Sequence, residues 1–184
     1  MRLFAAVVPP PQALTDLEDF LEPRRVVDGP RWTRPDQWHL TLAFMSAVHE
    51  RAVEGLVERL EEATSTRPSV RLALSGGGCF PDVTRAKVLW CGLRNGEQLE
   101  PLARAVRSAA SVAGAAPQGG PFRPHLTLAR FQRPVEGTRW VRLLEGYVGP
   151  EWTASEVVLV QSHLPRERGH RPHHEVLARL PLHP

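Results

Sequence analysis

The chain has 184 residues, of which 42% are hydrophobic and 23% are charged, proportions typical of a folded globular protein. No segment approaches the roughly 20 consecutive apolar residues that a membrane-spanning helix requires. The apolar run Leu3–Val8 is too short for a signal peptide and leads into prolines. Cys79 and Cys91 match no metal-binding or redox spacing. We therefore expect a cytoplasmic, reduced protein without a membrane partner or an obligate protein partner.

Positive charge is concentrated in the second half of the chain. Residues 1–92 contain 11 basic and 12 acidic side chains, a net charge of −1, whereas residues 93–184 contain 12 basic and 8 acidic side chains, a net charge of +4. This excess weakly favours an anionic ligand that contacts mainly the second half.

Hydrophobic spacing predicts a strand–helix–strand–helix–strand unit in the first half. The strands are expected at residues 2–8, 39–44 and 70–74, where apolar residues alternate with others or run continuously. The helices are expected at 14–21 and 53–60, where apolar residues recur at three- and four-residue intervals.

The second half repeats this unit with a shift of 86 residues. The shift carries the strands onto residues 88–94, 125–130 and 156–160, and the helices onto the region of 99–106 and onto 139–146. We therefore predict that the chain folds as a single domain built by an internal duplication, with halves of approximately 1–80 and 86–184 in the full span 1–184.

Glycine and proline clusters mark the boundaries of these elements. Pro9–Pro11 are expected to end the first strand, Gly76–Gly78 to close the first half, and residues 114–120 to separate a helix from the next strand. After the repeat, residues 161–173 have the composition of a polar, arginine-rich loop, and residues 174–182 have that of a final edge strand.

The two halves share the sequence HLTLA, which begins at His39 and again at His125. Because side chains alternate along a strand, each histidine shares a face with the threonine two residues later, Thr41 or Thr127, and the leucines lie on the opposite face. Two core strands with one polar face would also fit, but packing does not require a His–Thr pair repeated at identical spacing. Two similar lobes facing each other across a pseudo-twofold axis would bring both pairs into a central cleft, which we expect to be the active site.

Two facing imidazoles suit paired acid–base chemistry, in which one ring takes a proton and the other gives one. Two threonine hydroxyls beside them can donate hydrogen bonds to the non-bridging oxygens of a phosphate. A five-membered cyclic phosphate is already strained, so a positioned water and a protonated leaving oxygen suffice to open it. This chemistry requires no metal and no cofactor.

The two H-x-T-x motifs and their flanks, RWTRPDQWHLTLAF and GPFRPHLTLARF, resemble the two-histidine phosphoesterases. Within that superfamily the chain is most similar to the RNA 2′,3′-cyclic phosphodiesterases, once named bacterial 2′–5′ RNA ligases. The resemblance runs from RLFAAVVPP through KVLWCGL to VLVQSHL, essentially the full length. It implies an α+β bilobal fold with antiparallel sheets facing a cleft.

The same resemblance implies metal-independent hydrolysis of 2′,3′-cyclic phosphates, on RNA ends or small cyclic nucleotides, to 2′-phosphomonoesters. It assigns His39 as the proton donor to the leaving 3′ oxygen and His125 as the acceptor that activates water. The residues alone do not distinguish these two roles.

The sixth residues of the motifs differ, Phe44 in one copy and Arg130 in the other. Phe44 offers a stacking surface for a nucleobase, and Arg130 offers a charged contact to phosphate. Strict alternation instead places both with the leucines, so that only a strand end or a bulge brings them to the cleft. Arg123, two residues before His125 and on its face, is a third candidate for substrate binding.

Three other functions place different demands on the residues. A ligase that forms a lysyl adenylate needs a nucleophilic lysine, and the only lysine, Lys87, has no such motif around it; the reverse reaction, in which a cyclic phosphate joins a 5′-hydroxyl, needs none. A module that binds RNA without catalysis has no use for paired His–Thr faces.

A metal-dependent hydrolase would use the histidines near the end of the chain as ligands. These histidines lack the spacing of metal ligands on a helix. A solvated loop is therefore the preferred interpretation of the segment with His163, His170, His173 and His174. Where the family usually has a tyrosine near the final strand, a histidine stands here.

Overall fold

The computed structural model describes residues 1–25, 29–164 and 172–184. Its α-helices are α1 (Pro11–Leu21), α2 (Val53–Ser65), α3 (Glu100–Val112) and α4 (Thr138–Glu145). A turn of 3₁₀ helix, η2 (Pro35–Gln37), lies just before the first motif. The strands are β1 (Leu3–Val7), β2 (Arg31–Trp32), β3 (Leu40–Met45), β4 (Val70–Phe80), β5 (Ala86–Arg94), β6 (Leu126–Val135), β7 (Val148–Ala154), β8 (Glu156–His163) and β9 (His173–Pro181).

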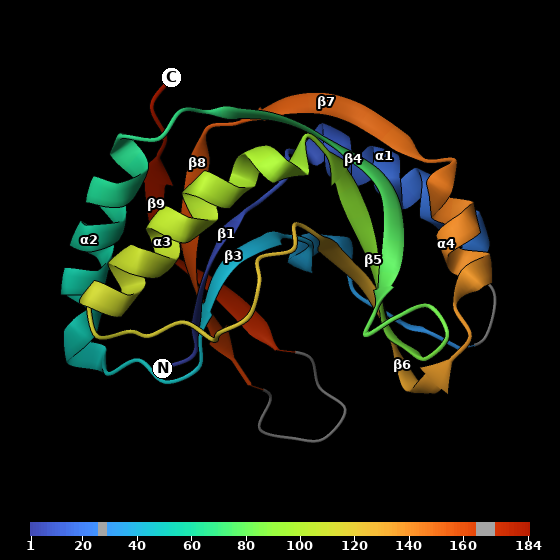
Figure 1. Cartoon of the computed structure of the whole chain (residues 1–184), viewed down its shortest axis with the longest axis horizontal. Coiled ribbons are helices and arrows are strands. Elements are labelled where there is room, and N and C mark those ends of the chain that lie inside the picture. Colours follow the sequence, from blue (N-terminus) through green and yellow to red (C-terminus); the bar gives the residue numbers. More distant parts are fainter. Residues whose placement is uncertain (26–28, 165–171) are drawn as a thin grey trace.

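The strands form a curled sheet in the order β7-β4-β5-β6-β3-β1-β8-β9, with β2 paired to β6. The pairs between these strands are antiparallel. Between β3 and β6 the ladder is reduced to the pair Leu40–Leu126, and the sheet bends into an arch (Figure 1). We call β2, β4, β5, β6 and β7 lobe A, and β1, β3, β8 and β9 lobe B. The predicted α+β fold with antiparallel sheets is confirmed.

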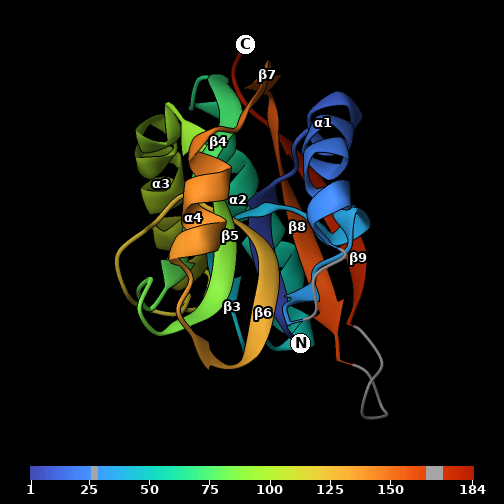
Figure 2. The ribbon, with the colours of Figure 1, turned by 90° about the vertical axis from the view of Figure 1, so that its right-hand side faces the viewer.

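Two helices cover the outer face of each lobe (Figures 1 and 2). In lobe B, α2 packs on β8 and β9, α3 packs on β3, and the two helices contact each other. In lobe A, α1 packs on β4 and β7, and α4 packs on β4. The buried faces of the helices follow the predicted spacing, with Leu17 and Leu21 in α1 and Leu102 and Val106 in α3. The two leucine faces of the HLTLA strands complete the core between these layers.

The two halves of the sequence are interwoven in the sheet. The shift of 86 residues relates β1 to β5, β3 to β6 and β4 to β8. However, β4 pairs with β5 of the second half, and β8 pairs with β1 of the first half. The third strand of each half therefore lies in the lobe built on the other half, and the lobes do not coincide with the halves. As a result, the two HLTLA strands, β3 and β6, are neighbours at the centre of the sheet.

The prediction that Gly76–Gly78 close the first half is wrong, because these glycines lie inside the long strand β4. Gly76 has a φ of +64°, which favours glycine, and the other two glycines are explained by close packing. A Cβ atom on Gly77 would lie 2.4 Å from Leu144 Cδ1, and one on Gly78 would lie 2.3 Å from Trp90 Cζ2. Glycine is required where another chain segment approaches the strand this closely.

The edges of the sheet differ from the prediction on one side and agree on the other. The edge strand β7 was not predicted. It contains Pro150, which an edge strand tolerates although proline donates no main-chain hydrogen bond. The predicted final strand is present at the opposite edge as β9. The loop expected at 161–173 is shorter at both ends, because β8 continues to His163 and β9 begins at His173.

Candidate active site

The paired motif histidines and threonines line one cavity. His39 and His125 immediately precede β3 and β6, and Thr41 and Thr127 lie within these strands. The cavity has a volume of about 670 Å³, and all four side chains are among its lining residues. The leucines of both motifs are buried on the opposite face of the sheet, so strand alternation places the polar pairs in the cleft.

A β-bulge in each motif strand brings Phe44 and Arg130 onto the cavity face. In the β1–β3 ladder, Ala43 pairs with Ala5 and Thr41 with Ala6, so Leu42 has no partner across the strand. One extra residue reverses the alternation that follows it. Phe44 therefore shares the face of Thr41 and lines the cavity.

The second motif contains the same irregularity. In the β5–β6 ladder, Ala129 pairs with Leu89 and Thr127 with Trp90, which leaves Leu128 unpaired. Arg130 consequently lines the cavity beside Thr127. Of the substrate-binding candidates, only Arg123 is absent from the lining of the cavity, and its side chain is exposed.

Both histidines are oriented by the same hydrogen bond. His39 Nδ1 lies 2.7 Å from the carbonyl oxygen of Gln37, and His125 Nδ1 lies 2.6 Å from the carbonyl oxygen of Arg123. Because a carbonyl oxygen only accepts, Nδ1 carries the hydrogen in each ring. In both rings Nε2 is thus the atom that can exchange a proton with a ligand. Arg123 contributes to this orientation through its main chain.

The surroundings of His39 are aromatic. Its ring stacks on Phe4, with centroids 4.5 Å apart and planes inclined by 20°, and His174 meets it edge-on at 5.7 Å. Burial is the main cause that lowers the pKa of His39 from 6.5 to about 4; repulsion by His174 and His125 adds to the effect, and the hydrogen bond to Gln37 opposes it. In the free protein at neutral pH His39 is therefore a neutral imidazole.

His125 lies in a similar aromatic pocket in lobe A. The ring of Phe80 meets it edge-on at 4.8 Å, and Trp90 lies at 6.2 Å. Burial lowers the pKa of His125, the hydrogen bond to Arg123 raises it, and the charge of Arg130 lowers it further. An anion bound between the two histidines would raise both pKa values, because it stabilises the charged imidazolium.

The sequence did not single out several lining residues as part of the site. Arg31, Trp32 and Thr33 lie in the flank of the first motif and reach the cavity because β2 pairs with β6. Gln37 lies in the same flank, two residues before His39. The histidine repeat gives no signal for the remaining ones, which come from distant segments: Phe4, Gln118, Ser162, Pro172 and His174.

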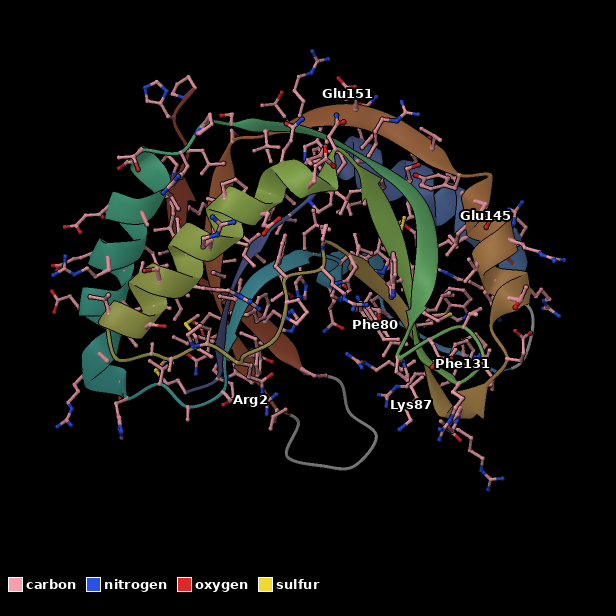
Figure 3. All side chains as sticks on the ribbon, in the orientation of Figure 1. Arg2, Phe80, Lys87, Phe131, Glu145 and Glu151 are labelled. Atoms are coloured by element: carbon pink, nitrogen blue, oxygen red, sulfur yellow. The ribbon has the colours of Figure 1, made fainter. Side chains whose placement is uncertain are left out.

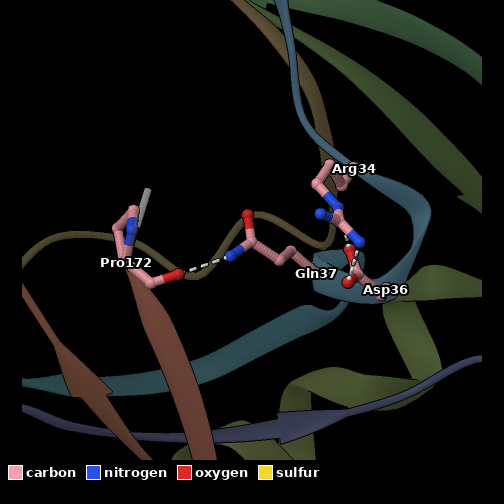
Figure 4. A network of polar contacts seen from close by, with 4 residues as sticks. All are labelled: Arg34, Asp36, Gln37 and Pro172. Carbon is pink, nitrogen blue, oxygen red and sulfur yellow. Dashed lines mark hydrogen bonds and ion pairs between the residues drawn. The ribbon is translucent and has the colours of Figure 1, made fainter. Parts of the chain in front are cut away.

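Gln37 connects the turn before His39 to lobe B. Its side-chain Nε2 donates a 2.7 Å hydrogen bond to the carbonyl oxygen of Pro172, just before β9, as Figure 4 shows. The same turn, η2, is braced by Arg34 and Asp36, whose side chains form an ion pair with N–O distances of 2.8 and 3.0 Å. The main-chain carbonyl of Gln37 thus orients the ring of His39. Its side-chain amide contacts the start of β9, the strand that carries His174.

Basic residues lie at the open side of the arch. Arg2 in lobe B and Lys87 in lobe A lie near this opening, whereas Glu145 and Glu151 lie on the outer face (Figure 3). The Arg2 guanidinium carbon lies 5.1 Å from the centroid of the Phe44 ring. This arrangement suits an anionic ligand with an aromatic part.

Three of the four tail histidines lie in strands, not in the solvated loop that was expected. His163 ends β8 and pairs with Glu175 at 2.9 Å, and His173 and His174 belong to β9. Only His174 of these lines the cavity. His170 lies outside the described residues. Within residues 1–25, 29–164 and 172–184, no three or more His, Cys, Asp or Glu side chains are grouped so as to hold a metal ion.

No helix in the described part of the chain combines the length and apolar character needed to cross a membrane.

Comparisons with protein families and with curated sequences identify relatives of this chain. The family model described as 2′-5′ RNA ligase superfamily matches residues 9–166. The RNA 2′,3′-cyclic phosphodiesterase of Thermus thermophilus is 28% identical over 173 residues, which cover 89% of this chain and 83% of the relative. The protein of that name from Archaeoglobus fulgidus is 29% identical over 133 residues, 72% of this chain and 74% of the relative.

A third protein of that name, from Aquifex aeolicus, is 32% identical over 104 residues. This alignment covers 55% of each protein, so the chain spans about half the length of that relative.

Solved structures share the fold over nearly the whole chain. A crystal structure of a protein from Thermus thermophilus has a TM-score of 0.79 and 27% identity, with 99% of this chain and 98% of that chain covered. The crystal structure of E. coli LigT complexed with 3′-AMP has a TM-score of 0.78 and 25% identity, with 98% and 97% covered. LigT has also been crystallised with NADP⁺.

Proposed function

Because this chain belongs to the 2′-5′ RNA ligase superfamily, as its motifs predicted, we propose that its cleft hydrolyses 2′,3′-cyclic phosphates to 2′-phosphomonoesters. The substrates would be RNA ends or small cyclic nucleotides. The observation that carries the proposal is the matched geometry of the two motifs. In one cavity, each histidine is held through Nδ1 by the carbonyl oxygen two residues earlier, which leaves both Nε2 atoms for proton transfer.

In the proposed reaction, His125 Nε2 takes a proton from a water molecule as the water oxygen bonds to phosphorus. The bond between phosphorus and the 3′ oxygen breaks, and His39 Nε2–H donates its proton to that oxygen. The product carries phosphate on the 2′ oxygen and a free 3′-hydroxyl. Thr41 and Thr127 donate hydrogen bonds to the non-bridging oxygens, where negative charge is greatest.

The pKa of His39 constrains how this reaction begins. With a pKa of about 4, roughly one His39 ring in a thousand is protonated at pH 7 in the free protein. The negative charge of the cyclic phosphate supplies the compensating interaction, since an opposite charge favours the imidazolium. Substrate binding and protonation of the proposed donor are therefore coupled.

Side chains around the catalytic pairs suit the rest of a nucleotide. Phe44 presents a ring on which a base can stack, and Arg130 and Arg31 form a register pair across β6 and β2 that can contact phosphates. The 3′-AMP complex of LigT supports a nucleotide ligand for a cleft of this fold. Arg123, exposed outside the cavity, is a candidate contact for the RNA chain preceding the cyclic end.

Ligation is the second candidate function, since a 5′-hydroxyl can occupy the position of the attacking group in the reverse reaction. The same two histidines would keep their roles, with His125 taking the proton of the 5′-hydroxyl and His39 protonating the leaving 3′ oxygen. Arg2 and Lys87, basic residues of the two lobes at the open side of the arch, favour the approach of two RNA ends.

A direct experiment separates these possibilities. Incubating the protein with a panel of 2′,3′-cyclic nucleotides, and with RNA ending in a cyclic phosphate, should yield 2′-phosphomonoesters. Joined RNA as the main product would favour ligation, and RNA binding without turnover of any substrate would favour a non-catalytic module. His39→Ala and His125→Ala variants provide the control for a contaminating nuclease.

A further inference from the structure

The wall of the cavity that carries Phe44 is held from outside by one side chain of α3. The bulge in β3 leaves Leu42 without a cross-strand partner. Its carbonyl oxygen accepts a 3.2 Å hydrogen bond from Arg107 Nε. Arg107 does not itself line the cavity.

The same guanidinium also holds the loop that faces Phe44. Arg107 Nη1 donates a 2.8 Å hydrogen bond to the carbonyl oxygen of Gly120, whose φ of +105° marks a sharp turn. Two residues earlier, the main-chain N–H of Gln118 donates a 2.8 Å hydrogen bond to the carbonyl oxygen of Phe44. Gln118 lines the rim of the cavity. The planar guanidinium thus connects both segments of this wall, as its fork of donors allows.

In the described part of the chain, the second motif has no equivalent clamp. There the carbonyl oxygen of the bulge residue, Leu128, accepts a 2.8 Å hydrogen bond from the main-chain N–H of Thr33. The position related to Arg107 by the shift of 86 residues is Leu21, which is buried in the core. The clamp therefore serves only the copy that ends in an aromatic residue.

The base of the clamp is rigid. Val106 and Ala110 of α3 are fully buried on either side of Arg107, and α3 packs against β3. The guanidinium therefore approaches the bulge from a helix that is packed in place. Removing its hydrogen-bond donors should change the positions of Phe44 and Gln118.

We propose that Arg107 is a positioning residue that holds Phe44 and Gln118 as the wall of a nucleobase subsite. This inference rests on the proposed function, in which the base of a cyclic nucleotide stacks on Phe44. Arg107 touches neither the phosphate nor the histidines, so it sets the affinity for the base and leaves the chemical step unchanged. The amide side chain of Gln118, which can donate and accept, is the polar group of this wall available to the edge of the base.

The test compares two substrates that differ only in the base: a 2′,3′-cyclic nucleotide and the 2,3-cyclic phosphate of 1-O-methylribose. Arg107→Met keeps the length of the side chain and removes its donors. It should raise KM for the cyclic nucleotide about tenfold with kcat changed less than about twofold, because a uniform binding contact is lost. KM for the baseless substrate should not change.

Two further variants make the outcome decisive. Arg104→Met, one turn away on the same helix, removes an exposed arginine that pairs with Glu100 and should leave both substrates unaffected. Arg107→Lys offers a charge without the planar fork, so its KM should lie between those of the wild type and Arg107→Met. Should Arg107→Met fail to fold, the lysine variant gives the answer by the same comparison of substrates.

Equal losses on both substrates, or a fall in kcat without a change in KM, would overturn the inference. So would a wild-type KM in both Arg107 variants. A wild-type protein that turns over neither substrate refutes the proposed function instead, which keeps the two failures distinct.

Discussion

The pH dependence of kcat/KM, which reports the free protein, should differ from that of kcat, which reports the substrate complex. The reason is that both histidines bind protons weakly in the free protein. Burial lowers the pKa of His39 to about 4 and also lowers that of His125 from 6.5. In the reactive form one of the two histidines is charged and the other is neutral. The population of this form falls as pH rises above the higher of the two pKa values. That value lies below 6.5. We expect kcat/KM to fall about tenfold per pH unit from pH 7 upward.

The bound substrate should shift this limb to higher pH. A phosphate anion about 4 Å from an imidazolium, at an effective dielectric constant of about 20, stabilises the charged ring by about 4 kcal/mol, or about 3 pKa units. Solvent in the cavity reduces this value, so we expect the alkaline limb of kcat to lie roughly 1–3 units above that of kcat/KM.

Steady-state rates with a 2′,3′-cyclic nucleotide from pH 5 to 9 provide the assay, since the cyclic diester itself does not titrate in this range. Coincident limbs in the two profiles would refute the coupling of substrate charge to histidine protonation. A kcat/KM that rises through pH 7–9 would refute the assignment of a protonated imidazole as the acid.

Replacing Phe44 with alanine should raise KM for cyclic nucleotides about five- to 150-fold, the equivalent of about 1–3 kcal/mol of stacking, with a smaller effect on kcat; an insoluble variant would show a core role instead. Turnover should persist in EDTA, and a loss that Zn²⁺ or Mn²⁺ restores would contradict a metal-independent reaction. Thr41→Ala and Thr127→Ala should each lower kcat less than the histidine variants, since each removes one neutral hydrogen bond; stopped assays on matched protein concentrations compare them. Because the unfolded chain binds the His39 proton near pH 6.5 and the folded chain only near pH 4, the free energy of unfolding should fall by about 2–3 kcal/mol as pH drops through this window. Urea unfolding of a His39→Asn variant should lack that component, and an equal drop in both proteins would assign it to other groups.

The placement of the catalytic candidates was predictable because it depends on local periodicity. In both copies of HLTLA, the leucines are buried and the histidine and threonine line the cavity, as alternation alone requires. The positions of Phe44 and Arg130 depend on a bulge, which has no pattern in a single strand. A bulge exists only relative to the partner strands β1 and β5, so strict alternation gave the wrong face for both residues.

Long-range pairing accounts for the other differences. The repeat predicted which segments correspond, but the exchange of β4 and β8 between the lobes depends on contacts between halves. Gly76–Gly78 indicated a break by composition, whereas the packing of Leu144 and Trp90 against β4 explains Gly77 and Gly78, and a φ of +64° explains Gly76. His174 reaches His39 only because β8 and β9 form the far edge of lobe B.

The measurement that tests the central claim most directly is phosphorus NMR of the product formed from a 2′,3′-cyclic nucleotide by the wild type, His39→Ala and His125→Ala. The account predicts the 2′-phosphomonoester as the main product of the wild type. Each variant should lose roughly 10²–10⁴ in rate, because each removes one general acid or base. A product that is mainly the 3′-phosphomonoester, or a histidine variant that retains near-normal turnover, would contradict the paired-histidine mechanism.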